Sequence, residues 1–128
     1  MRSPTLRVAP ETDRRLHAVV AAVIVTAAVG LGILWLVVVP TGPEACALSM
    51  PGPRNCFPSD RVSAAQVGTA LVAISAIVPV ALALVVARAR PRAARTIARI
   101  GLVLTSVTAG YALFTSAWIP ALAFARLV

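Results

Sequence analysis

Long apolar runs separated by shorter polar stretches dominate the pattern of this chain. The runs cover residues 16–39, 63–87 and 100–124. At a rise of 1.5 Å per residue, a helix over each run is long enough to cross the ~30 Å hydrocarbon core of a bilayer. The pattern therefore predicts an all-α membrane protein with three transmembrane helices.

The segments around the runs are polar or rich in proline. Residues 1–15 form a basic tail with no apolar period, and residues 40–62 form a loop in which closely spaced prolines exclude a helix. Residues 88–99 form an arginine-rich connector, and residues 125–128 form the C-terminus. The first run exceeds the roughly 7–15 apolar residues of a signal peptide, so we expect a retained span rather than a cleaved one.

Single residues refine the second and third helices. Ser63 and Gln66 have the spacing of a capping box, which places the start of the second helix near residue 63. Pro79 removes a hydrogen bond to the carbonyl of Ser75, which predicts a fixed kink, with a functional hinge as the alternative. Pro91 suits the first turn of a helix, so the third helix has a possible start inside the connector.

Composition and charge support membrane residence and predict an orientation. Hydrophobic residues make up 59% of the chain, and 12 basic residues stand against 4 acidic ones. The positive excess lies in residues 1–15 and 88–99, whereas acidic and basic residues balance in 40–62. Because positive segments stay cytoplasmic, the N-terminus is predicted inside and the C-terminus outside. Trp35 and Trp118 then both fall at the outer interface, which indole rings prefer.

The arginines indicate a lipid surface rather than nucleic acid as their partner. They are not interleaved with aromatic residues, and most flank apolar runs, where anionic head groups lie. Every basic residue is Arg and the apolar residues are mainly Ala, Val and Leu, a bias typical of a GC-rich bacterial genome, so we expect the bacterial inner membrane. The residues assigned to topology and lipid contact are Arg88, Arg90, Arg92, Arg95 and Arg99.

The two cysteines fall in the proline-rich loop that this orientation places outside. In an oxidising space, a bond between Cys46 and Cys56 would stabilise the fold by about 3 kcal/mol. Two free thiols and a redox-active pair are the alternatives. Their spacing is not the C-x-x-C of thiol oxidoreductases, so a structural disulfide is the preferred interpretation.

The spans carry no residue pattern for catalysis or ligand binding. They lack carboxylates and lysines, and His17 lies at the border of the first span, where an interface role is more common than ligation. His17 has no second His or Cys nearby to complete a metal site. We therefore expect no metal, no cofactor and no enzyme activity.

Small residues and one tyrosine distinguish the third run. Small residues at four-residue spacing let helix backbones approach, and two adjacent strips suggest contact with another protein as well as with the chain itself. Tyr111 lies near the middle of the run, and its hydroxyl needs a partner from another helix of this chain, another subunit or a ligand such as a quinone. The strips comprise Gly101, Thr105 and Ala109, then Thr108, Ala112 and Ser116.

These features predict a non-catalytic accessory, assembly or stabilising subunit of a larger bacterial inner-membrane complex. The alternative is a homo-oligomeric transport or permeability protein whose pore is lined by the Thr and Ser face of the third helix. An enzyme is the third hypothesis, and it requires either turnover of the cysteine pair or contact between Tyr111 and a redox cofactor.

Overall fold

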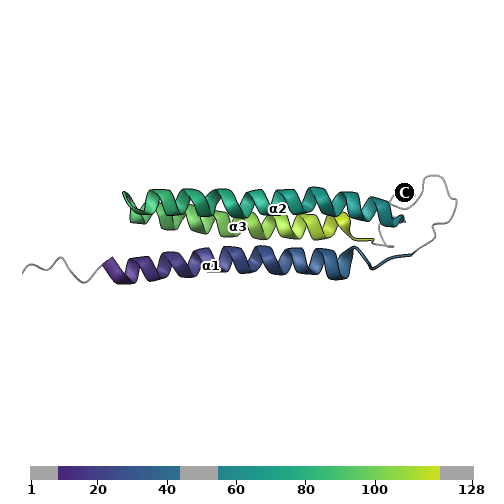
Figure 1. Cartoon of the computed structure of the whole chain (residues 1–128), viewed down its shortest axis with the longest axis horizontal. Coiled ribbons are helices and arrows are strands. Elements are labelled where there is room, and N and C mark those ends of the chain that lie inside the picture. Colours follow the sequence, from purple (N-terminus) through teal and green to yellow (C-terminus); the bar gives the residue numbers. More distant parts are fainter. Residues whose placement is uncertain (1–8, 44–54, 119–128) are drawn as a thin grey trace, which may run out of the picture.

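Three long helices lie side by side along the length of the molecule (Figure 1). The computed structural model describes residues 9–43 and 55–118. Helix α1 spans Ala9–Ile33 and continues into a π-helical turn, η1, over Leu34–Val38. Helix α2 spans Pro58–Ala87, and α3 spans Pro91–Ser116. The prediction of an all-helical chain with three long apolar helices is confirmed.

The start of α2 corrects the sequence prediction. The helix begins at Pro58 rather than near residue 63. Proline is favoured in the first turn because no intrahelical donor is needed there, and Asp60 in the same turn interacts favourably with the positive end of the helix. Ser63 is not a cap, because its hydroxyl donates to the carbonyl of Asp60 at 3.0 Å inside the helix.

The other boundaries shift for similar reasons. Helix α1 begins at Ala9, within the predicted tail, with Pro10 in its first turn. Helix α3 begins at Pro91, the start that the proline in the connector indicated, so it includes most of the segment 88–99 as well as the apolar run from residue 100. It ends at Ser116, and the predicted remainder of the span from 119 onward lies outside the described residues.

The bundle has two chemically different ends (Figure 1). The start of α1 meets the turn between α2 and α3, where Leu16 packs with Ala94 and Ala98. We call this the arginine end and define it as residues 13–19 and 86–99. The end of α1 with η1, the start of α2 and the end of α3 form the opposite end, here called the loop end and defined as residues 35–43, 55–65 and 115–118.

Alanine is the commonest buried residue between the helices, and most large apolar side chains point outward, with Leu16, Val23, Leu34 and Val72 as buried exceptions. A bundle in water shows the reverse pattern, with large apolar residues inside. Where lipid is the solvent, small residues let helices approach and large ones contact acyl chains. The buried alanines include Ala65, Ala76, Ala83, Ala94, Ala98, Ala109 and Ala112, and the exposed residues include Ile24, Leu36, Val67, Ile77, Val103 and Val107.

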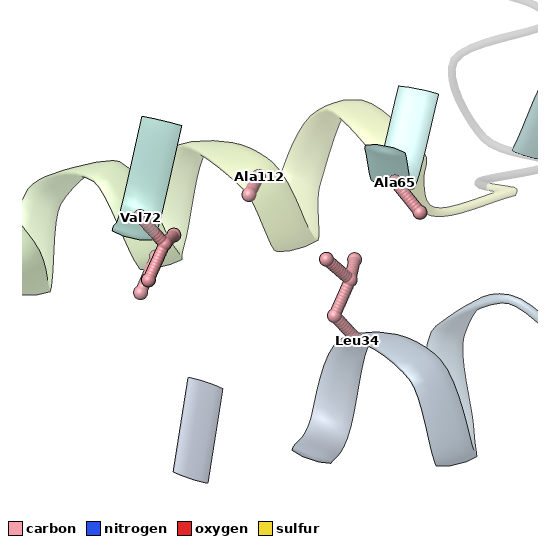
Figure 2. Packing of buried hydrophobic residues seen from close by; sticks show 5 residues of the cluster. Leu34, Ala65, Val72 and Ala112 are labelled. Atoms are coloured by element: carbon pink, nitrogen blue, oxygen red, sulfur yellow. The ribbon is translucent and has the colours of Figure 1, made fainter. Parts of the chain in front are cut away.

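Helix α3 is the central element of the packing. It contacts both α2 and α1, and its contact with α2 is the more extensive. Only 11% of the most apolar window of α1 is buried inside the chain, compared with 28% for α3. Figure 2 shows how α1 joins the pair near the loop end: Leu34 projects from η1 into a cluster with Ala112 of α3 and Ala65 and Val72 of α2.

Candidate functional site

Arg61 is the centre of a polar network at the loop end. Its side chain is only 2% exposed. The guanidinium donates from Nε to the carbonyl of Val39 at 3.0 Å, and from Nη1 to the carbonyls of Asn55 at 3.2 Å and Cys56 at 2.6 Å. Carbonyl dipoles thus solvate a buried charge and offset part of the cost of removing it from water. Arg61 joins the end of the first helical segment to the start of α2.

Asn55 extends the network to α3. Its backbone has a φ of 59°, in the left-handed region that asparagine tolerates better than most residues. The side-chain amide donates to the carbonyl of Thr115 and, at 3.2 Å, to that of Ala117. These carbonyls lie at the C-terminal end of α3, where a helix leaves acceptors without intrahelical donors. We call Arg61, Asn55 and the carbonyls that they bind the loop-end clasp.

Gly42 lets the chain after η1 come close to Arg61. Its φ is 153°, and a Cβ at this position would lie 2.6 Å from Arg61 Nη1. Any larger residue would therefore displace the guanidinium from its acceptors. The clasp binds segments of the chain to one another and presents no free nucleophile, so its arrangement fixes the ends of the helices.

The π-helical turn positions a second polar contact near the clasp. The Val39 amide donates to the Leu34 carbonyl at 2.9 Å, a five-residue spacing that widens the helix. Trp35 in this turn donates from Nε1 to the hydroxyl of Thr69 on α2 at 3.0 Å. Thr69 in turn donates to the Ala65 carbonyl at 2.7 Å. The two elements are thus joined by an indole-to-hydroxyl hydrogen bond.

The seam between α2 and α3 satisfies the acceptor that Pro79 leaves without a donor. Helix α2 continues through Pro79, and the Thr105 hydroxyl donates to the carbonyl of Ser75 at 3.1 Å. The Ser75 and Thr108 hydroxyls are 2.8 Å apart, which adds a second bond. Gly101 lies directly against the proline, since a Cβ there would be 2.5 Å from Pro79 Cβ. We call these five residues the proline seam.

The structure places both predicted small-residue strips mainly inside the bundle. Gly101, Thr105 and Ala109 are buried. A Cβ on Gly68 would lie 2.7 Å from that of Ala112, and one on Gly30 would lie 3.0 Å from that of Ala109. The strips thus pack α3 against α2 and α1. Ser116 is buried as well, with a hydroxyl that has no partner among the described atoms.

Tyr111 lies on the outer face of α3. Its side chain is 59% exposed, beside the exposed Val107 and Phe114 at helical spacing. Within the described part of the chain, its hydroxyl has no hydrogen-bond partner. Of the three predicted partners, another helix of this chain is not observed among the described residues, and another subunit and a ligand stay predictions.

The predicted lipid-contact arginines gather at the arginine end. Arg88 and Arg90 lie in the turn after α2, and Arg92, Arg95 and Arg99 lie on α3. His17, on α1 at the same end, has Nδ1 2.8 Å from the carbonyl oxygen of Asp13 and 3.4 Å from its carboxylate. The contacts of His17 thus lie within one helical turn, and its interface role stays a prediction.

The structure describes only one of the two cysteines that were predicted to form a disulfide. Cys56 is buried at 3% exposure and its carbonyl accepts from Arg61. Cys46 lies outside the described residues, so the pairing stays a prediction. No group of three or more potential metal-binding side chains occurs in the part of the chain that the structure describes.

Sequence reasoning missed the loop-end clasp. The charge pattern includes Arg61 only among the charges that balance within residues 40–62, a segment predicted to be free of helix. The signal that identifies the site is Pro58 followed by Asp60, which marks a helix start and places Arg61 in the first turn of α2. The reach of Arg61 to Val39 depends on tertiary structure and has no local signal.

Comparison of the chain with protein-family models, with curated proteins and with solved structures found no match.

Proposed function

We propose that this protein is a three-span subunit of a bacterial inner-membrane complex, with an accessory, assembly or stabilising role and no catalytic activity. The observation that carries the proposal is Tyr111, whose hydroxyl faces outward from an apolar helix surface without a partner in the described chain. A hydroxyl in hydrocarbon favours a site that offers an acceptor, and a neighbouring transmembrane helix supplies one.

The orientation belongs to the same proposal. The exposed arginines at the arginine end support a cytoplasmic location for that end. The loop end, with Trp35, then faces the outside, and the clasp joins the helix ends on that side. A partner with an external domain would dock there.

The pore-forming alternative receives less support. It requires a hydroxyl face that is open to a channel, but Thr105 and Ser116 are buried and Thr108 bonds to Ser75. The same groups that would line a pore between copies thus hold this chain together.

Site-specific photo-crosslinking in native membranes tests the proposed partner. Benzoylphenylalanine at residue 111 is expected to capture a second polypeptide, which mass spectrometry then identifies. The matched control is the same probe at Ile77, an exposed position on α2. Efficient crosslinking at 77 but none at 111, or a tagged chain that purifies as a lone monomer, would contradict the proposal.

The disulfide is a further part of the proposal. Cys56 is buried within the clasp, so a bond to Cys46 would anchor the external loop to the helix ends. Protein denatured without reductant should show no mass shift with a maleimide-polyethylene glycol reagent, and reduction should produce one. Labelling of unreduced protein would show that the thiols are free.

A further inference from the structure

Arg99 lies deeper along the bundle than the other arginines of the α2–α3 connection. In the antiparallel pair of α2 and α3, Gly101 packs against Pro79, so Arg99 lies level with residue 81 of α2. Helix α2 continues beyond this level for six more residues to Ala87, or about 9 Å, without an ionisable group. The exposed large apolar residues of this stretch are Leu82, Leu84 and Val85. Arg99 therefore lies at a depth where the outer surface of α2 is still apolar.

The environment of Arg99 differs from that expected of a charge in a membrane span. Its side chain is exposed and forms no ion pair within the described part of the chain. Charged residues in membrane spans almost always face the interior of a bundle, where they pair with another charge or with carbonyl groups. Arg99 instead faces outward from these three helices. Its position favours a further helix that covers this face and supplies an anionic group.

Arg99 and Tyr111 border a row of exposed residues on α3, which we call the outer seam. Spacings of three and four residues alternate along it, the pattern of helices that pack at a small crossing angle. A Cβ on Gly110 would have no atom within 4 Å, which leaves room for close approach of a second helix. Arg99 precedes the first seam residue and Tyr111 follows Gly110, so the two flank the seam on opposite sides. The outer seam comprises Ile100, Val103, Val107, Gly110 and Phe114.

A second copy of this chain does not supply the anionic group. The chain has four acidic residues, and none of them lies in the apolar runs 16–39, 63–87 and 100–124. Two copies with the same orientation would also bring their Arg99 side chains to the same depth, where like charges repel. The occupant that complements this face is therefore a helix of a different polypeptide.

We propose that the outer seam binds a transmembrane helix of a different polypeptide, with a carboxylate beside Arg99 and a hydrogen-bond acceptor beside Tyr111. The two positions are twelve residues apart, or about 18 Å along the axis of α3, so one partner helix reaches both. Charge complementarity places the carboxylate near the end of the partner helix that lies at the arginine end. The inference rests on the partner subunit proposed above and adds the surface and the chemistry of that partner.

Photo-crosslinking from the seam tests this inference on the full chain in native membranes. Benzoylphenylalanine replaces Val103, which lies one turn from Arg99. Ile77 is the matched control position, because the register of α2 and α3 places residues 77 and 103 at the same depth. Arg99→Gln tests the ion pair, and Arg88→Gln removes the same charge from an exposed position in the turn. The yield of crosslinked product is compared at equal expression.

The probe at residue 103 is expected to capture the same polypeptide as the probe at residue 111, and the probe at residue 77 is expected to capture none. Arg99→Gln should lower the yield from residue 103 roughly fivefold, the effect of losing one ion pair, whereas Arg88→Gln should lower it less than about twofold.

Two kinds of failure are distinguishable. Capture from residue 111 but not from residue 103 would overturn the seam and leave the proposed function intact, whereas no capture from either position would contradict the proposed function itself. Equal yields in Arg99→Gln and Arg88→Gln would overturn the ion pair and assign Arg99 to lipid head groups, which a long side chain can reach. A crosslinked product that contains only this chain would overturn the assignment to a different polypeptide.

Discussion

At the scale of single residues, one buried arginine connects the ends of helical segments. Arg61 reaches the main-chain carbonyls of Val39, after η1, and of Cys56, before α2, and Asn55 reaches those at the end of α3. The last carbonyl groups of a helix have no intrahelical donor, so the side chains of Arg61 and Asn55 donate to acceptors that would otherwise need another partner. A planar guanidinium suits this role because its fixed donors point in several directions at once.

Replacement of Arg61 by Gln should destabilise the protein by about 3 kcal/mol, because buried carbonyls lose charged donors and cannot reach water. Arg61→Lys should recover only part of this loss, since an ammonium lacks the planar fork. The measurement is unfolding in detergent micelles, followed by far-ultraviolet circular dichroism. Arg99→Gln, an exposed change of equal charge, is the control. If Arg61→Gln lowers the free energy of unfolding by less than about 0.5 kcal/mol, the loop-end clasp does not contribute substantially to stability.

A second residue-scale prediction concerns close approach at the proline seam. Gly101→Ala places a methyl group 2.5 Å from Pro79 Cβ, so the helices must separate locally. We expect a loss of about 1–3 kcal/mol in the same unfolding measurement. Gly110→Ala on the same helix has no atom within 4 Å and should be neutral or slightly stabilising. Equal effects of the two substitutions would indicate a general helix-propensity effect instead of a contact.

At the scale of elements, α3 supplies a hydrogen-bond donor that α2 lacks because of its proline. Pro79 leaves a carbonyl of α2 without its usual donor, and a threonine of α3 supplies one. The compensation explains how a proline occurs in the middle of an apolar helix without an unsatisfied acceptor in hydrocarbon.

A double-mutant cycle tests this compensation. Thr105→Val alone should cost about 1 kcal/mol, because the Ser75 carbonyl loses its donor. In a Pro79→Ala background, the restored amide of residue 79 can bond to that carbonyl, and Thr105→Val should cost markedly less. The unfolding free energies of the four proteins give the coupling directly. Additive effects would show that Thr105 does not serve the acceptor that Pro79 releases.

The sequence pattern predicts the helices much better than their contacts. Apolar runs of sufficient length identify the three helices, and α2 ends at Ala87, directly before Arg88, the first arginine of the connector. The start of α2 differs from the predicted one because Pro58 lies in the first turn of a helix, where proline is favoured, whereas in a helix interior it would act as a breaker. The same rule applied to Pro91 places the start of α3 correctly. The clasp joins residues that are far apart in sequence, so no local periodicity encodes it.

At the scale of the whole molecule, the distribution of side-chain size and charge is the one expected of a bundle of helices that can cross a membrane. Small residues lie between the helices, large apolar residues cover the outside, and arginines gather at one end. A surface of this kind in water would be prone to association, whereas in lipid it contacts acyl chains. The two ends of the bundle differ in positive charge, and this difference is the basis of the proposed orientation.

The activity of alkaline phosphatase fused to the C-terminus tests the proposed orientation, because this reporter is active only outside the cytoplasm. We expect high activity for the unchanged chain and a substantial loss when five arginines are all replaced by Gln, namely Arg88, Arg90, Arg92, Arg95 and Arg99. An inactive phosphatase on a stably expressed, unchanged chain would contradict the proposed orientation. Full activity in the arginine variant would show that these arginines do not determine it.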